Sequence, residues 1–390
     1  MKNLVRNVAL GLIIVSLVSC REKVPTENTP GKSEKKVKAG FIYDGPVRDW
    51  GWTHAHEVAR KKVMKKFPWF ESISVENIPA GDAERFIDRL LLEEKCDVIF
   101  TTSLSYMDAT INAAKKYPNK IFMNCGGYKS AQNVGTYSVD IYQMFYLNGL
   151  MGGALTKSNK LGYVAACSAA EVVRQINAFA LGVREVNPEA KIFVKWLHSW
   201  YDPANARKAA ESLIVEGCDV LAFTEDSTST VEVAEEATAR GRPVYTFSHY
   251  SPMQKFGPNS VVSGQLVDWA VMYEYILSRI YKDTWTNEDL WWTAKEQAAI
   301  LGSNFEHPIN PKFVEELKKI TVSIAEGKTN VYDLVMTRLE QMKKGSFEPF
   351  TGPLTDQAGT VRVPSGKVAV RELRRTMNWF IDNVVGSVPE

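Results

Sequence analysis

The sequence predicts an α/β protein of two Rossmann-like lobes, each with a parallel sheet, joined by a hinge. One observation is a repeat: Lys95-Cys96-Asp97-Val98 has its counterpart 122 residues later in Gly217-Cys218-Asp219-Val220. A second is that apolar strands alternate with amphipathic helices in each half, which is the pattern of βαβ units around a parallel sheet. A repeat of whole βαβ units exceeds any solenoid period and indicates two similar lobes.

Both halves are expected to contain the same elements in the same order. The expected strands are 40–43, 72–78, 97–102 and 120–124, then 162–165, 191–197, 219–224 and 243–247. The expected helices are 54–66, 82–94 and 106–116, then 172–186, 205–216 and 229–239. Hinge crossings are expected near 157, 265 and 287, giving a first lobe of 38–157 plus 265–286 and a second of 158–264 plus 287–385.

Composition and missing motifs narrow the class of function. Lys and Arg (47) barely exceed Asp and Glu (45), so no basic face is available for nucleic acid. The sequence holds no phosphate-binding loop, dinucleotide glycine fingerprint, nucleophile elbow or His-Glu-x-x-His run. Without a Cys-x-x-Cys, and with His54-Ala55-His56 as the closest His pair, no metal site is expected. These absences favour a binding protein without cofactor or metal over an enzyme.

The N-terminus carries a predicted export signal. Lys2 and Arg6 precede an apolar run, Val8–Val18, that is too short to span a membrane. Leu17-Val18-Ser19-Cys20 resembles the lipobox of bacterial lipoproteins, which predicts a signal peptide over 1–19 and acylation of Cys20. The polar stretch 20–37 is expected to be a tether. The protein is therefore expected outside the cytoplasm, held to the membrane by lipid.

Ligands of open parallel sheets bind beyond the carboxyl ends of the strands. Two sets of loops should therefore face each other across a cleft between the lobes. These loops carry polar and aromatic side chains. The candidate ligand-binding residues are Asp44, Trp50, Trp52, Thr102, Ser103 and Tyr106 in the first lobe, and Arg174, Trp200, Glu225, Asp226 and His249 in the second.

Several runs of the sequence resemble the basic membrane protein (BMP) family of substrate-binding lipoproteins. The resemblance extends over residues 38 to 385 and rests on the set as a whole. The runs include Phe41-Ile42-Tyr43-Asp44-Gly45-Pro46-Val47-Arg48-Asp49-Trp50-Gly51-Trp52, Tyr137-Ser138-Val139-Asp140, Glu171-Val172-Val173-Arg174-Gln175 and Phe350-Thr351-Gly352-Pro353-Leu354-Thr355-Asp356.

The resemblance implies a type I periplasmic-binding fold that delivers purine nucleosides or bases to the permease and ATPase of an ABC importer. It implies that Asp44 holds the purine edge and that Trp52 stacks on its face. The family's ribose-gripping carboxylate is missing from 247–252, which favours a free base such as adenine, guanine or xanthine. Two alternatives stay open: a nucleoside-cleaving hydrolase with Asp44 or Glu225 as base, and a ligand-sensing receptor for a signalling partner.

Overall fold

The computed structural model describes residues 35–389. Residues Lys36–Glu390 form one compact unit, which contains two large sheets. The predicted signal peptide, Cys20 and all but the last residues of the predicted tether lie outside the described residues. Among residues 35–389, no helix is both long and apolar enough to cross a bilayer.

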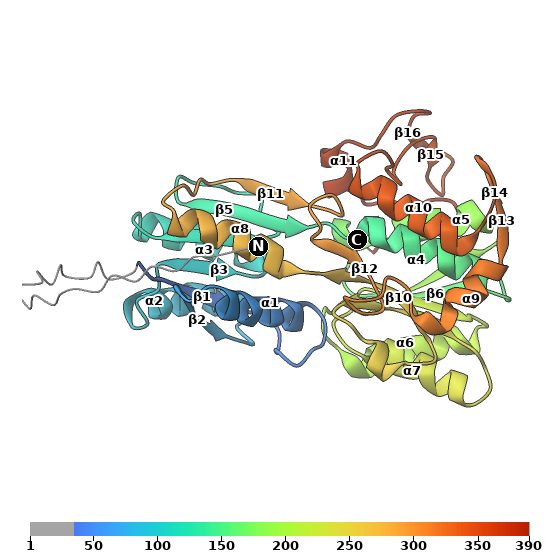
Figure 1. Cartoon of the computed structure of the whole chain (residues 1–390), viewed down its shortest axis with the longest axis horizontal. Helices are drawn as coiled ribbons and strands as arrows, with labels where there is room; N and C mark the ends of the chain where they lie inside the picture. The colour runs from blue at the N-terminus through green and yellow to red at the C-terminus, as the bar shows by residue number, and fades with distance from the viewer. Residues whose placement is uncertain (1–34, 390) are drawn as a thin grey trace, which may run out of the picture. The chain divides into compact units, whose positions relative to one another are not determined.

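The first sheet has six strands, all paired in parallel. Its order is β11-β5-β4-β3-β1-β2, so β1 lies next to the edge strand β2 and the later strands add on its other side (Figure 1). The strands are β1 (Val37–Ile42), β2 (Phe70–Val75), β3 (Val98–Thr101), β4 (Ile121–Cys125), β5 (Val134–Val139) and β11 (Asp289–Trp292).

The second sheet repeats this order with added edge strands. It runs β12-β10-β9-β8-β6-β7-β17, and only the β10–β12 pair is antiparallel. The strands are β6 (Lys160–Ala165), β7 (Lys191–Trp196), β8 (Val220–Phe223), β9 (Tyr245–Tyr250), β10 (Val261–Val267), β12 (Ala299–Leu301) and β17 (Val384–Val385).

Helices cover both sheets. The repeated helices are α1 (Trp52–Lys66), α2 (Ala83–Leu92) and α3 (Met107–Lys116), with counterparts α5 (Ala170–Val186), α6 (Pro203–Val215) and α7 (Ser229–Ala239). The remaining helices are α4 (Tyr142–Leu155), α8 (Trp269–Tyr281), α9 (Pro311–Lys319), α10 (Val331–Lys343) and α11 (Arg371–Arg375). Three short 3-10 turns lie at Ala80–Asp82, Leu104–Tyr106 and Gln254–Phe256.

The predicted repeat is confirmed, and equivalent residues of the two lobes also pack in the same way. A Cβ on Gly40 of β1 would lie 2.9 Å from Leu90 of α2, and one on Gly162 of β6 would lie 2.9 Å from Leu213 of α6. Glycine at the same place in both lobes lets a helix approach the first strand of each lobe closely. Cys96 and Cys218 are buried at the entrances of β3 and β8.

Helix α4 is buried almost all round and packs tightly against α5. A Cβ on Gly149 would lie 2.1 Å from the Phe179 carbonyl oxygen, and one on Gly182 would lie 2.0 Å from the Tyr146 carbonyl oxygen. Only glycine permits this separation, so Gly149 and Gly182 serve helix packing.

The chain passes between the sheets three times: two passages lie away from the expected 157 and 287, and one lies close to the expected 265. The first passage is at 140–141, because α4 packs on the second lobe instead of closing the first. The second is at Asp268, because β10 pairs with β9 in the second sheet while α8 packs on α1. The third lies within 293–298, because β11 pairs with β5. Strand pairing thus extends the first lobe to Trp292.

The C-terminal part of the chain is attached to the second lobe. Helix α10 packs on α4, α11 packs on α5, and β17 pairs with β7 at the sheet edge. Two small antiparallel hairpins belong to this part: β13 (Thr321–Ile324) with β14 (Gly327–Asn330), and β15 (Leu354–Thr355) with β16 (Val361–Val363). This part of the chain positions α11 beside the cleft.

Candidate functional site

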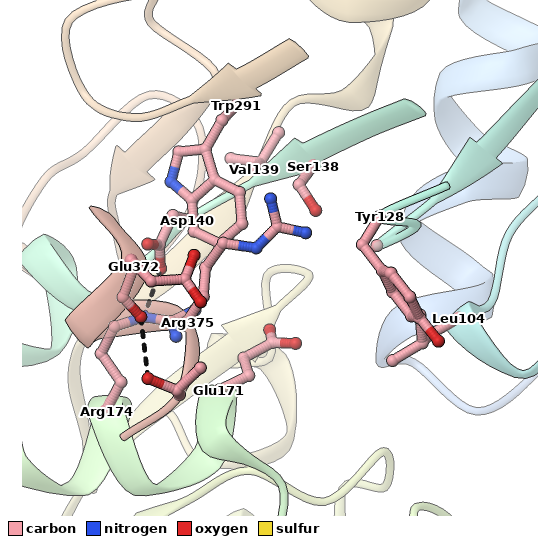
Figure 2. A pocket seen from close by; sticks show the side chains of 12 residues that line it. Leu104, Tyr128, Ser138, Val139, Asp140, Glu171, Arg174, Trp291, Glu372 and Arg375 are labelled. Atoms are coloured by element: carbon pink, nitrogen blue, oxygen red, sulfur yellow. Dashed lines mark hydrogen bonds and ion pairs between the residues drawn. The ribbon is translucent and has the colours of Figure 1, made fainter. Parts of the chain in front are cut away.

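A cavity of about 520 Å³ opens where the carboxyl ends of first-sheet strands meet the start of α5. This volume lies within the ~300–1,000 Å³ typical of small-molecule sites. Figure 2 shows Leu104 and Tyr128 on one wall and the charged residues on the other. The lining residues are Leu104, Gly126, Tyr128, Ser138, Val139, Asp140 and Trp291, with Glu171 and Arg174 from α5 and Glu372, Arg375 and Thr376 from the α11 segment.

Arg174 lines this cavity and is held by two hydrogen bonds. Its Nε–H donates to Asp140 Oδ1 at 3.2 Å, and its Nη1–H donates to the Arg374 carbonyl oxygen at 2.6 Å. The Arg174 side chain is almost fully buried. The ion pair therefore ties α5 to the first crossing of the chain, at 140–141.

Glu171 faces the cavity one helical turn before Arg174 (Figure 2). Its Oε1 accepts hydrogen bonds from the Tyr250 hydroxyl at 3.3 Å and from Gln175 Nε2 at 3.1 Å. Burial raises the pKa of the Glu171 carboxyl, and the nearby Arg174 charge opposes the rise. Glu171 thus offers a poorly solvated carboxyl group to a ligand.

Asp44 lies beside the cavity, in the loop after β1. Its carboxyl is exposed and accepts a hydrogen bond from the Ser103 hydroxyl, and Ser103 directly precedes Leu104 of the cavity wall. Desolvation by the surrounding protein raises the pKa of Asp44. An accessible carboxylate at this position can accept hydrogen bonds from ligand N–H groups.

Trp52, the first residue of α1, is half-buried next to this loop. Its indole Nε1–H donates to the Thr102 carbonyl oxygen at 2.7 Å. Its ring contacts Tyr250, Trp269 and His56 edge-on, with centroid distances of 5.1, 5.3 and 4.7 Å. The structure thus brings Trp52 together with Thr102 and, across the lobes, with Tyr250.

The loop 49–52 of the first lobe contacts the second lobe directly. The Trp52 backbone N–H donates to Asp226 Oδ1 at 2.9 Å, and the Ser251 hydroxyl donates to the Gly51 carbonyl oxygen at 3.4 Å. Trp50 packs edge-on against Phe256 at 5.2 Å, and Lys255 Nζ lies 3.3 Å from the Trp50 ring centroid. We refer to this set of contacts as the closed side of the cleft, and to the cavity as its open side.

Two buried carboxyl groups meet on the closed side. Asp49 accepts hydrogen bonds from the backbone N–H groups of Gly51, Thr53 and His54 at 2.8 to 2.9 Å. Burial raises the pKa of Asp49 to about 6. The pKa of Asp226 is raised well above its usual range, first by burial and then by the charge of Asp49. The two carboxyls belong to different lobes.

The sequence profile described as "ABC transporter substrate-binding protein PnrA-like" matches residues 36–334. The chain belongs to this family. The predicted resemblance to the BMP family is confirmed, and PnrA-like proteins are solute-binding proteins of transporters, not enzymes.

Two relatives of this PnrA-like chain are named for different ligands. It is 32% identical to a purine-binding protein of Brucella abortus over 360 residues, covering 92% of this chain and 95% of the relative. It is 38% identical to a putative ABC transporter glucose-binding protein of Haloferax volcanii over 269 residues, covering 69% of this chain and 67% of the relative.

Solved structures confirm the predicted fold of this PnrA-like protein. An ABC transporter solute-binding protein from Aeropyrum pernix matches with a TM-score of 0.68 at 14% identity, covering 80% of this chain and 92% of that one. One from Conexibacter woesei matches with a TM-score of 0.63 at 17% identity, covering 80% and 98%. At these identities the likeness concerns the fold alone.

Of the eleven predicted site residues, Arg174 alone is part of the cavity lining, and four of the others are placed as follows. The Tyr106 hydroxyl donates to the Ile78 carbonyl oxygen in the first-lobe core. His249 is buried between Phe145 and Phe223 and interacts with Gln265 through Nδ1, and burial lowers its pKa to about 3. Glu225 is fully buried, and Trp200 is 43% exposed. A buried Glu225 outside the cavity lining is poorly placed as a hydrolytic base.

Most residues that line the cavity of this PnrA-like protein were not predicted from its sequence. Tyr128, Glu171, Trp291 and Arg375 line the cavity but were not candidates. Glu171 precedes Arg174 by three residues, which places both on one helix face, and this spacing could have found it. No local pattern marks Arg375, which follows the last family-matched residue by 41 positions and reaches the cavity only through tertiary packing.

Proposed function

We propose that this ABC transporter substrate-binding protein binds a purine base in the cleft between its lobes. The observation that carries the proposal is the open-side cavity. It combines the aromatic side chains of Tyr128 and Trp291 with carboxylates and a guanidinium at the meeting point of both lobes. The Brucella abortus relative, named as a purine-binding protein, supports the same ligand class.

A flat heterocycle needs ring faces for stacking and fixed polar groups for its edges. Tyr128 is 66% exposed, so its ring is available to a ligand. Asp44 and Glu171 supply acceptors for ring or exocyclic N–H groups, since a buried donor left unpaired costs ~1–3 kcal/mol. Trp52 adds an aromatic side chain beside Asp44. We propose a free base over a nucleoside because the loop after β9 holds no carboxylate for ribose hydroxyls.

Titration calorimetry with bases, nucleosides, glucose and amino acids tests this proposal. We expect purine bases to bind, and Asp44→Ala to weaken them at least as much as Trp52→Ala, ~5- to 150-fold by the usual stacking loss. Trp379→Ala, at a buried residue that does not line the cavity, is the control and should lower stability only. Tight glucose binding that survives both cleft substitutions would instead favour the ligand class of the Haloferax volcanii relative.

We further propose that the protein is an extracytoplasmic lipoprotein that serves a permease and an ATPase. The support is the lipobox at Leu17–Cys20 together with the transporter family. Two or more acyl chains, at ~0.8 kcal/mol per buried CH₂, anchor a protein stably. Cys20→Ala should therefore move the protein from the membrane to the soluble fraction. Retention of that variant in membranes would contradict the lipoprotein proposal.

A further inference from the structure

Three guanidinium groups lie over the indole ring of Trp291 on the open side of the cleft. Arg371, Arg375 and Arg174 place their Cζ atoms 4.6, 5.0 and 5.5 Å from the ring centroid. Two of these arginines come from α11, which lies outside the family-matched residues. The three arginines differ in their hydrogen bonds, and this difference indicates which of them has donors available for a ligand.

Arg174 and Arg371 each donate a short hydrogen bond to the protein. Arg174 is buried between Asp140 and the Arg374 carbonyl oxygen. Arg371 Nη2–H donates to Asp289 Oδ2 at 2.8 Å. Arg371 also lies outside the cavity lining.

Arg375 is held only loosely. Its Nη2–H donates to the Gly127 carbonyl oxygen at 3.4 Å, and its Nη1 lies 3.6 Å from Asp289 Oδ2, beyond good hydrogen-bond length. Figure 2 shows its guanidinium extending from the Trp291 side of the cavity toward the wall formed by Tyr128 and Leu104. The Arg375 guanidinium therefore lies in the cavity wall with N–H donors available to a ligand.

We propose that Arg375 is a specificity-determining residue that selects 6-oxopurines, such as guanine and hypoxanthine, over 6-aminopurines. This inference rests on the proposed purine function. A guanidinium fork matches two adjacent acceptors, and a 6-oxopurine presents O6 and N7 in that arrangement. Adenine presents an amino donor in place of O6, so donor would face donor. The carboxyl groups of Asp44 and Glu171 suit the N1–H donor of a 6-oxopurine, whereas N1 of adenine is an acceptor.

The test compares guanine, hypoxanthine and adenine binding by calorimetry in the full chain and in three variants. Arg375→Ala should weaken 6-oxopurine binding ~5- to 150-fold while leaving adenine nearly unchanged. Arg375→Lys keeps the charge but loses the fork, and should lose most of the discrimination as well. Arg371→Ala is the matched control, because it removes a guanidinium from the same helix and the same indole ring but not from the cavity lining.

The outcomes separate the two proposals. Failure of the unchanged protein to bind any purine overturns the proposed function and this inference with it. Purine binding that Arg375→Ala weakens equally for all three bases, or not at all, overturns the inference alone. An equal change of preference in Arg371→Ala also overturns it, because the effect would then come from the position of Trp291.

Discussion

The closed and open sides of the cleft are built from similar residues but engage them differently. On the closed side, Trp50 and Asp226 are satisfied by groups of the opposite lobe. On the open side, Tyr128 and Asp44 are accessible to solvent. The closed-side contacts are therefore the same for every ligand. The open-side groups can form hydrogen bonds and ring contacts that differ from one ligand to another. Affinity common to all ligands and preference between ligands should have separate structural origins.

On the closed side, some interactions favour closure of the lobes and others oppose it. The exposed Lys255 over Trp50 contributes ~0.5–1 kcal/mol, and the hydrogen bond from the Trp52 backbone N–H to Asp226 contributes ~0.5–1.5 kcal/mol. Against these stands the burial of two neighbouring carboxyl groups, Asp49 and Asp226. A nearly balanced closure is one that a ligand's differential affinity can shift.

The largest expected effect comes from Gly51→Ala on the closed side. A Cβ there would lie 2.4 Å from Asp226 Oδ1 and 2.8 Å from the Asp226 Cα, so the lobes must separate and the Trp52–Asp226 hydrogen bond is lost. We expect every ligand to bind ~10- to 150-fold more weakly, by a similar factor. Calorimetry measures the loss, and solution scattering should show less compaction with saturating ligand.

Gly81→Ala is the control for this substitution, because a Cβ at Gly81 meets no atom within 4 Å. It should leave both affinity and compaction unchanged. If Gly51→Ala altered the preference between ligands instead of lowering all affinities together, the division between the two sides would fail.

Tyr128→Ala tests the open side and should have a smaller, selective effect. The ring is 66% exposed, so its stacking is expected at the low end of the range, ~1 kcal/mol or about fivefold in affinity. Planar bases should lose this affinity, while any non-planar ligand should not. Calorimetry with one ligand of each kind decides, and equal losses would place Tyr128 among the residues that stabilise closure.

Ligand affinity should fall as pH rises, because closure brings Asp49 and Asp226 together. The closed form raises both pKa values and so retains a proton that the separated lobes release. The contribution of Asp49 to closure is therefore fully present below its ordinary pKa of 3.8 and is lost as pH rises through about 6. Other groups that face or adjoin this pair are Asp44, Glu225, Tyr201, His54 and Lys255.

Calorimetry at pH 5.5 and pH 8 should thus show tighter binding at the lower pH for a ligand that does not itself titrate. Asp226→Asn keeps the acceptor for the Trp52 N–H but cannot ionise, so its affinity should depend less on pH. An unchanged pH dependence in Asp226→Asn would assign the effect to Asp44 or Glu171 on the open side.

Glu225→Gln should give the smallest effect, on stability alone. Burial raises the pKa of Glu225 to about 8, and its Oε2 is buried without a hydrogen-bond partner. The stability that protonation of Glu225 contributes is fully present below its unfolded pKa near 4.5 and is lost as pH rises through about 8. Glu225→Gln should raise Tm at pH 8 more than at pH 5. A Tm lowered equally at both values would show that the carboxylate is needed in the fold.

Local patterns in the sequence predicted the repeated part of the fold well. Gly40 and Gly162 mark equivalent strands, and the apolar segments after Cys96 and Cys218 form the central strands of both sheets. The placement of α4 was not predictable in this way. An apolar helix can cover either lobe, and the close contact of Gly149 with Phe179 becomes visible only in three dimensions.

The site was predictable in part for the same reason. Strand ends located Asp44, Ser103 and Arg174 at or beside the cavity. They could not show that the Trp50 ring packs against Phe256 of the other lobe, because a sequence does not distinguish an aromatic residue that contacts ligand from one that contacts protein. The α11 residues of the cavity wall arrive through long-range packing, which leaves no periodic signal.

The three passages of the chain between the sheets also set the order in which the lobes can be completed during synthesis. The first sheet lacks its edge strand β11 until Trp292 of the 390-residue chain has left the ribosome. The second lacks β17 until Val385 has been made. Neither lobe is a continuous segment that could finish before the other begins. Truncation of the chain before β11 would remove part of both lobes, and so the two lobes are expected to mature together in the last quarter of translation.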